Sequence, residues 1–278
     1  TWAANSEWQQ SELLNPPGTR PQDNVELEAM TILNMKGESE SWSWETPYGK
    51  RVPGSQPIQG GIIQVMNLKS KQRHFVIGEP GARWQPFGFG AREGFTTMPC
   101  WNHWPVAQLP NDGRVTPAFD RPSSTCLGTL WPVKHKTDRP DVMIGHNLYG
   151  MTAKPAKELA VLARSWNSSA PLHGSGAGFE SLGYAKNQRA YVLNCRSADQ
   201  PGKWELTLAG SEPSPVLNPA FVIKGWGDAN PKLTLQGAEI PRGKDFRYGH
   251  RRTLEGTDLI LWIKTESHVP LTLTLSPE

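Results

Sequence analysis

The 278-residue sequence has few cysteines and none of the compact motifs that hold metals or phosphates. Cys100, Cys126 and Cys195 are far apart and form no CxxC pair, which disfavours a zinc knuckle or a thioredoxin-type site. They leave open one disulfide with a free thiol, or no disulfide at all. The histidines form no HExxH motif and no GxSxG elbow is present, which disfavours zinc and serine hydrolases. We therefore expect neither a metal nor another cofactor.

The sequence also lacks a long apolar run and an excess of charge of one sign. No segment approaches the roughly 20 apolar residues that a membrane-spanning helix needs, so we do not expect membrane insertion. The 29 basic and 26 acidic side chains give a formal net charge of +3. This near-balance argues against the concentrated basic surface that nucleic acid requires. The chain begins at Thr1 without a signal-like stretch, and we interpret it as a processed or excised segment.

Tryptophan, glycine and proline are abundant, with 12, 27 and 25 residues. So much glycine and proline is incompatible with a simple helical bundle. Short β-rich runs separated by polar turns fill the C-terminal half; they cover residues 190–195, 204–210, 220–226, 232–237, 259–265 and 271–277. Strands of this length and spacing predict a mainly β protein built as a large antiparallel β-sandwich.

The rest of the chain predicts one helix and one long loop around that sandwich. Residues 1–24 are polar and Pro-rich and predict an extended lead-in, leaving 25–278 as a single sandwich domain. Residues 62–68 and 74–79 predict a strand pair joined by a polar turn. An apolar stripe at three- and four-residue spacing predicts a short helix near 155–166. The irregular region between residue 80 and about 150 predicts a long decorated loop, where a site is most often found.

The densest cluster of chemically useful residues lies in this loop. Trp101 and Trp104 enclose Asn102 and His103, and two prolines bracket the stretch. Flat aromatic rings beside polar side chains suit the apolar faces and polar rims of sugars. A structural loop, in which the tryptophans plug the ends of the sheets, is the alternative. Five other tryptophans fall in strand-like patterns and predict core or sheet-face positions; they are Trp42, Trp44, Trp204, Trp226 and Trp262.

Basic residues near this loop predict contacts with an anionic group. Arg114 and Arg121 could bind a carboxylate or a sulfate in a bidentate manner, or pair with Asp112 and Asp120 as surface ion pairs. Upstream, Arg83 and Trp84 flank this cluster, and Trp131 lies in the same long central region.

Histidine and tyrosine supply the acid and base candidates. His103 is the first choice and His146, close to Tyr149 in the sequence, is the second. Such a pair can abstract the proton next to a uronate carboxylate, while Asn102 or an arginine stabilises the developing charge. A glycoside hydrolase would instead need two opposed carboxylates, for which Glu79, Glu93, Asp112 and Asp120 are available.

Four stretches resemble a known group of proteins. They are residues 30–35 (MTILNM), 63–81 (IQVMNLKSKQRHFVIGEPG), 101–114 (WNHWPVAQLPNDGR) with 120–123 (DRPS), and 254–267 (LEGTDLILWIKTES). They resemble the β-rich region of large secreted bacterial proteins of polysaccharide breakdown, with galactose-mutarotase-like super-sandwich domains that also occur in polysaccharide lyases. The resemblance covers about 25–278 and implies a secreted or periplasmic location. A helical toroid usually accompanies the sandwich in a complete lyase, and the sequence contains none.

Two main functions and one weaker one follow from these expectations. The first is a carbohydrate-active protein that acts on an acidic polysaccharide, as a β-eliminating lyase or as a hydrolase. The second is a non-catalytic glycan-binding or structural module of a larger polysaccharide-degrading enzyme. The third is association with other domains or subunits through the aromatic loop, since exposed aromatic patches often mark interfaces.

Overall fold

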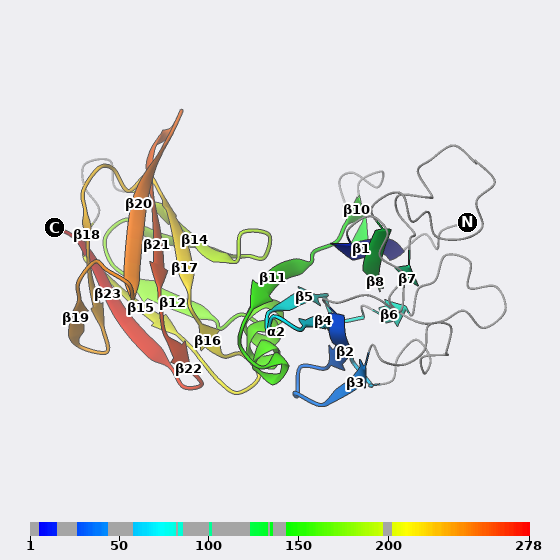
Figure 1. The fold of residues 1–278 in the computed structure, drawn as a ribbon. Helices are drawn as coiled ribbons and strands as arrows, with labels where there is room; N and C mark the ends of the chain where they lie inside the picture. The colour runs from blue at the N-terminus through cyan, green and yellow to red at the C-terminus, as the bar shows by residue number, and fades with distance from the viewer. Residues whose placement is uncertain are drawn as a thin grey trace. The chain divides into compact units, whose positions relative to one another are not determined.

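The computed structural model describes residues 6–15, 27–43, 58–81, 83–85, 100–101, 123–132, 134–135, 143–196 and 202–278. The chain divides into two compact units, Thr1–Ala160 (unit 1) and Val161–Glu278 (unit 2). Antiparallel sheets make up most of both units, and one short helix joins them along the chain (Figure 1). The predicted fold class is therefore confirmed, whereas the predicted boundaries at 24 and 25 stay a prediction.

Unit 1 contains a five-stranded antiparallel sheet, here called the β4 sheet. Its strands are, in order across the sheet, β11 (Leu148–Thr152), β5 (Arg73–Ile77), β4 (Ile63–Leu68), β2 (Leu27–Leu33) and β3 (Ser39–Ser43). Five of the six residues of β4 are buried, as expected of a central strand covered on both faces. The polar turn predicted after residue 68 joins β4 to β5, with Lys71 in the left-handed region at φ 65°.

A second sheet of unit 1, the β8 sheet, is built around one long strand. Its strands are β1 (Ser6–Asn15), β8 (Ser123–Pro132), β6 (Arg83–Gln85) and β7 (Cys100–Trp101). β1 pairs with β8 along its whole length. β6 and β7 therefore share the other edge of β8. A two-stranded ribbon of β9 (Lys134–His135) and β10 (Met143–Ile144) completes the described strands of unit 1.

The predicted helix is present as a 3₁₀ turn, η2 (Ala156–Glu158), followed by α2 (Leu159–Asn167). Pro155 precedes the first turn, where a missing N–H costs nothing. Lys154 and Glu158 form an ion pair of 3.1 Å one turn apart. The apolar stripe is buried at Leu159, Ala160, Ala163 and Trp166.

Unit 2 is a sandwich of two five-stranded sheets. The first, the β23 sheet, contains β12 (Leu172–Ser175), β15 (Trp204–Leu208), β23 (Leu271–Pro277), β18 (Pro231–Leu235) and β19 (Ala238–Ile240). The second, the β17 sheet, contains β13 (Phe179–Ala185), β14 (Ala190–Cys195), β17 (Ala220–Lys224), β21 (Gly256–Ile263) and β20 (Phe246–Thr253). A short ribbon pairs β16 (Val216–Leu217) with β22 (Glu266–Ser267). β14 and β17 are parallel; every other pair in unit 2 is antiparallel.

Strand alternation builds the core between the two sheets. Leu271, Leu273 and Leu275 of β23 are buried, and their partners on β15 are buried as well. Leu193, Phe221 and Leu261 of the β17 sheet belong to the same apolar cluster. One face of each sheet is thus covered and the other carries the polar residues, as the sequence pattern predicts.

The predicted core tryptophans of unit 2 are structural. Trp204 and Trp226 are fully buried, and each indole Nε1 donates to a backbone carbonyl, that of Ala177 at 2.9 Å and that of Ala229 at 2.8 Å. Buried indoles need such a partner, so these residues have their polar requirement met inside the fold. Cys195 is a buried free thiol in the same core.

Candidate functional site

The structure describes part of the predicted site. Asn102, His103, Trp104, Arg114 and Arg121 lie outside the described residues, so the densest cluster of the sequence stays a prediction. The described residues fall into two groups. Arg83, Trp84 and Trp101 belong to the β8 sheet, whereas His146 and Tyr149 lie at the edge of the β4 sheet.

The register of the β8 sheet brings tryptophans from distant parts of the sequence to one face. Trp84 pairs with Thr129, and Trp101 pairs with Thr125. Positions 125, 129 and 131 of β8 share a face because they are an even number of residues apart, and paired residues share a face too. Trp84, Trp101 and Trp131 therefore occupy positions on the same face. Arg83 pairs with Leu130 and occupies a position on the opposite face, apart from the tryptophans.

Tyr149 lies on β11, the edge strand of the β4 sheet, and is 41% exposed. Gly150, the next residue, pairs with Phe75 on the other face of the strand. A Cβ atom at position 150 would overlap the Phe75 ring, so only glycine lets β11 lie flat against β5. This close approach fixes the position of β11, which carries Tyr149, against β5.

His74 is the histidine that the pairing of strands brings next to Tyr149. It pairs with Met151 of β11, while Tyr149 pairs with Val76, so His74 and Tyr149 are diagonal neighbours on one face. Such neighbours lie about 7–8 Å apart between Cα atoms, within reach of long side chains. Burial lowers the pKa of His74, and its buried Nδ1 has no hydrogen-bond partner among the described residues. The neutral imidazole is thus favoured, which is the form that can accept a proton.

His146, the predicted partner of Tyr149, makes a different contact. It precedes β11, and its Nδ1 lies 3.5 Å from Oε1 of Glu79, which follows β5. Glu79 was also a candidate for a hydrolase pair of carboxylates, and here it faces an imidazole. The other candidates, Glu93, Asp112 and Asp120, lie outside the described residues.

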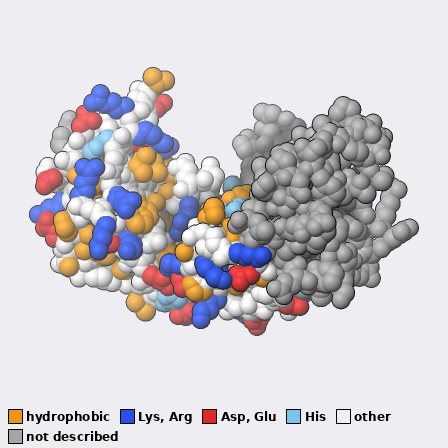
Figure 2. Space-filling view, in the orientation of Figure 1, with side chains coloured by type: hydrophobic (Ala, Val, Ile, Leu, Met, Phe, Trp, Pro, Cys, Tyr) orange, Lys and Arg blue, Asp and Glu red, His pale blue; other side chains and the backbone are white. Residues whose placement is uncertain are grey.

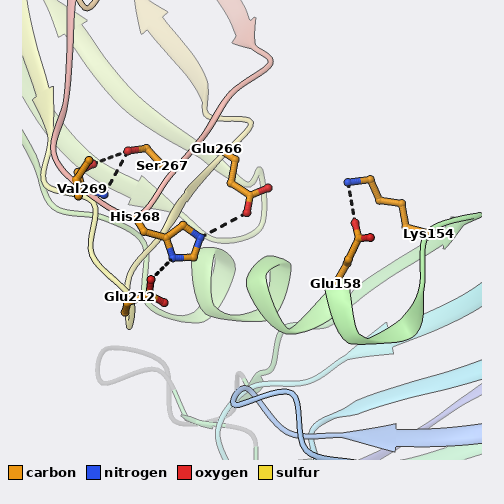
Figure 3. A network of polar contacts seen from close by, with 7 residues as sticks. All are labelled: Lys154, Glu158, Glu212, Glu266, Ser267, His268 and Val269. Atoms are coloured by element: carbon orange, nitrogen blue, oxygen red, sulfur yellow. Dashed lines mark hydrogen bonds and ion pairs between the residues drawn. The ribbon is translucent and has the colours of Figure 1, made fainter.

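A histidine of unit 2, His268, lies between two carboxylates. Nδ1 of His268 is 2.9 Å from Oε1 of Glu212, and its Nε2 is 3.4 Å from Oε1 of Glu266 (Figure 3). The carboxylates contact opposite edges of the ring, so they cannot share one metal ion with a single ring nitrogen. Ser267 and Val269 close the same turn by hydrogen bonds between them. This network holds the connection between β22 and β23. Among the described residues, no cluster of three or more His, Cys, Asp or Glu side chains could bind a metal ion.

The outer face of the β17 sheet carries a half-buried tryptophan, Trp262. It pairs with Arg247 of β20, whose guanidinium lies 5.3 Å from the ring centroid. Ile260, two residues away on the same face, is 38% exposed. Figure 2 shows hydrophobic side chains with Lys and Arg side chains around them on the visible face of unit 2. Trp262, predicted as a core or sheet-face residue, is a sheet-face residue.

Within the described part of the chain, no helix has the length and apolar character needed to cross a bilayer. No known protein family, curated protein or solved structure matches this chain. The resemblance to super-sandwich regions of polysaccharide-degrading proteins therefore stays a prediction from the sequence.

Proposed function

We propose that the chain is a carbohydrate-active protein that acts on an acidic polysaccharide by lyase-like β-elimination. The register of the β8 sheet carries this proposal, because it gives Trp84, Trp101 and Trp131 positions on one face. Pyranose rings present apolar C–H faces that pack on flat aromatic rings. The β8 partners of Trp101 and Trp84 are four residues apart, about 13 Å along a strand, which suits a polymer better than a single sugar.

The acid and base of this proposal are Tyr149 and a histidine beside it. In β-elimination a base removes the proton on the carbon next to the uronate carboxylate, and the bond to the glycosidic oxygen on the neighbouring carbon breaks. A carbon–carbon double bond forms, and an acid returns a proton to the leaving oxygen. Neutral His74 is the described candidate for the base, and the Tyr149 hydroxyl is the candidate for the acid. His103 and Asn102 keep their predicted roles in the same reaction.

The location of the protein is part of the same proposal. Polysaccharides of this kind are extracellular polymers, so we propose a secreted or periplasmic protein. The hydrolase has less support, because Glu79, the described member of the candidate carboxylates, contacts His146.

A non-catalytic glycan-binding module is the second candidate, and unit 2 favours it. Trp262 and Ile260 form a partly exposed apolar strip beside Arg247 on the outer face of the β17 sheet. Such a surface can hold a sugar chain without any acid or base. In this case Tyr149 and His74 would have no effect on the polymer.

Product formation separates the two candidates. The full chain is incubated with polygalacturonate, alginate and a neutral glucan, and both ultraviolet absorbance of unsaturated uronates and new reducing ends are followed. A lyase gives both signals on a uronate polymer, and Tyr149→Phe lowers the rate by about 100-fold or more because it removes one hydroxyl proton donor. Tyr248→Phe, a conservative change in unit 2, serves as the control and leaves the rate unchanged. New reducing ends without the absorbance would indicate a hydrolase, and no product with retained binding would indicate the module.

The tryptophan face is tested separately by binding to the same polymers. Trp84→Ala, Trp101→Ala and Trp131→Ala should each weaken binding by roughly threefold to tenfold, the value of one aromatic contact. Trp8 pairs with Leu130 in the same sheet, so it occupies a position on the opposite face. Trp8→Ala is therefore the matched control. Equal losses in all four variants would argue against a tryptophan platform.

A further inference from the structure

One end of the unit 2 sandwich contains a small hollow that is partly open to solvent. Its walls come from α2, from β13 and β14 with the turn between them, and from the segment around β16. Pro215, Val216 and Pro219 give it an apolar side. Arg189 and Tyr184 give it a polar one, and none of its described lining residues is acidic.

Arg189 carries a positive charge into this hollow without a matching negative charge. The side chain is mostly buried, and burial lowers its pKa. Its Nη2 donates to the carbonyl oxygen of Leu217 at 3.3 Å. Among the residues that the structure describes, no carboxylate forms an ion pair with it. Withdrawing a charge from water is unfavourable unless a counter-charge or enough hydrogen bonds replace the water.

The backbone conformation of Arg189 also sets this residue apart. Arg189 ends the four-residue turn between β13 and β14 with φ 51°, in the left-handed region that favours glycine or asparagine. A long charged side chain at such a position costs backbone energy that glycine would not. The strain and the unmatched charge occur at the same residue, inside the same hollow.

The neighbours of Arg189 add hydrogen-bond donors. Burial raises the pKa of Tyr184 to about 12, so its hydroxyl keeps its proton at neutral pH. Arg189 lines the same hollow, and its charge partly opposes this rise. Oδ1 of Asn218 accepts a hydrogen bond from the Thr265 amide, which leaves the Asn218 side-chain N–H groups as donors. A cation and neutral donors on an apolar wall form a receptor for one anionic group.

We propose that this hollow, the Arg189 pocket, binds the carboxylate of a uronic-acid residue, with the Arg189 guanidinium contacting both carboxylate oxygens. The choice of a uronate rests on the proposed function. The hollow has room for one small group rather than a whole sugar ring, so it would take the carboxylate while the ring lies at its mouth. Tyr184 and the prolines would cover the apolar face of that residue. Unit 2 would then contribute a contact of its own with the acidic polymer.

Titration calorimetry on the full chain tests this pocket with four probes: D-glucuronate, D-galacturonate, D-glucose and acetate. We expect at least one uronate to bind about tenfold or more tightly than glucose and acetate, since only the uronates carry both the ring and the charge. Arg189→Gln should weaken that binding by about tenfold or more, the value of a charge-assisted contact. Arg252→Gln is the matched control, because Arg252 is an exposed arginine of β20 in the same unit. It removes the same charge and should leave binding unchanged.

A second variant guards against loss of the fold. Arg189→Gly relaxes the left-handed backbone, so it should keep or raise the midpoint of urea unfolding while it abolishes uronate binding. Three results would each disprove uronate binding in the Arg189 pocket. Neither uronate binds more tightly than glucose, acetate binds as tightly as the uronates, or Arg189→Gln leaves the affinity for the uronates unchanged. The proposed function fails differently, by absence of polymer cleavage and of binding that depends on Trp84, Trp101 and Trp131. Arg189-dependent uronate binding without cleavage would keep the pocket and remove the lyase.

Discussion

The hydroxyl of Tyr191 donates a 2.7 Å hydrogen bond to the carbonyl oxygen of Ala170, and both residues are buried. Tyr191→Phe removes the donor and leaves a buried carbonyl without its partner. We expect the free energy of unfolding to fall by about 1–3 kcal/mol, measured by urea denaturation. Tyr184→Phe is the control. The Tyr184 ring packs against Tyr191, but its hydroxyl forms no hydrogen bond among the described residues. A loss no greater than that of the control would contradict this role of Tyr191.

His74 should make stability depend on pH in the acidic range. Burial lowers its pKa in the folded state, whereas the unfolded chain has the ordinary value of about 6.5. Below that value the unfolded state binds more protons than the folded state, so stability falls as the pH falls. His74→Gln removes this contribution, and its free energy of unfolding should change less than that of the parent between about pH 7 and pH 5. Parallel pH profiles for the two proteins would rule the explanation out.

Gly150 should not tolerate a side chain. A Cβ atom there would overlap the ring of Phe75, which is itself buried. We expect Gly150→Ala to lower the free energy of unfolding by about 1–3 kcal/mol, as other overpacked sites do. Gly249→Ala is the matched strand control, because nothing lies within 4 Å of a Cβ at that position. Phe75→Leu in the Gly150→Ala background should recover part of the loss; no recovery would point to a cause other than this contact.

The backbone register predicts the redox state of two cysteines. Cys100 of β7 and Cys126 of β8 are direct antiparallel partners, a placement with Cα atoms about 4.5–5.5 Å apart and within the range of a disulfide. In an oxidising compartment we expect them to be joined, with Cys195 left free. Thiol titration of the denatured, unreduced protein should then count one thiol, and reduction should lower stability by about 3 kcal/mol. A count of three would exclude the bond.

The strands that the sequence predicts well are those with a buried face. β14 and β23 begin and end at the predicted residues, because alternate side chains enter the core along their whole length. β20 was not predicted. Only Phe246 of its eight residues is buried, and the strand depends on its pairing with β21 at the edge of the sheet. An edge strand with a polar sequence takes its conformation from its neighbour, and its own sequence gives little sign of it.

The candidate site was predicted less completely, and for a related reason. Tyr149 was identified from its residue type and its closeness to His146 in the sequence. His74 was not identified, because it becomes a neighbour of Tyr149 only when β5 pairs with β11. Arg189 lies in a turn, and the residues around β16 that form the apolar side of its pocket are about thirty positions away in the sequence. Trp84, Trp101 and Trp131 were each noted, but their common face depends on the register with β8. Chemistry can be recognised from residue types, whereas proximity between strands cannot.

β23 lies in the middle of its sheet, between β15 and β18, although it follows both in the chain. During synthesis, β15 and β18 therefore have no common neighbour until residues 271–277 leave the ribosome. Until then the sheet is incomplete, and Trp204 and the leucines on the inner face of β15 and β18 cannot form the full core. Unit 2 should consequently fold late and in one step, by contacts between residues far apart in sequence, which are slow to form. A ribosome stalled before residue 271 would hold a chain that is prone to aggregate or to be captured by chaperones.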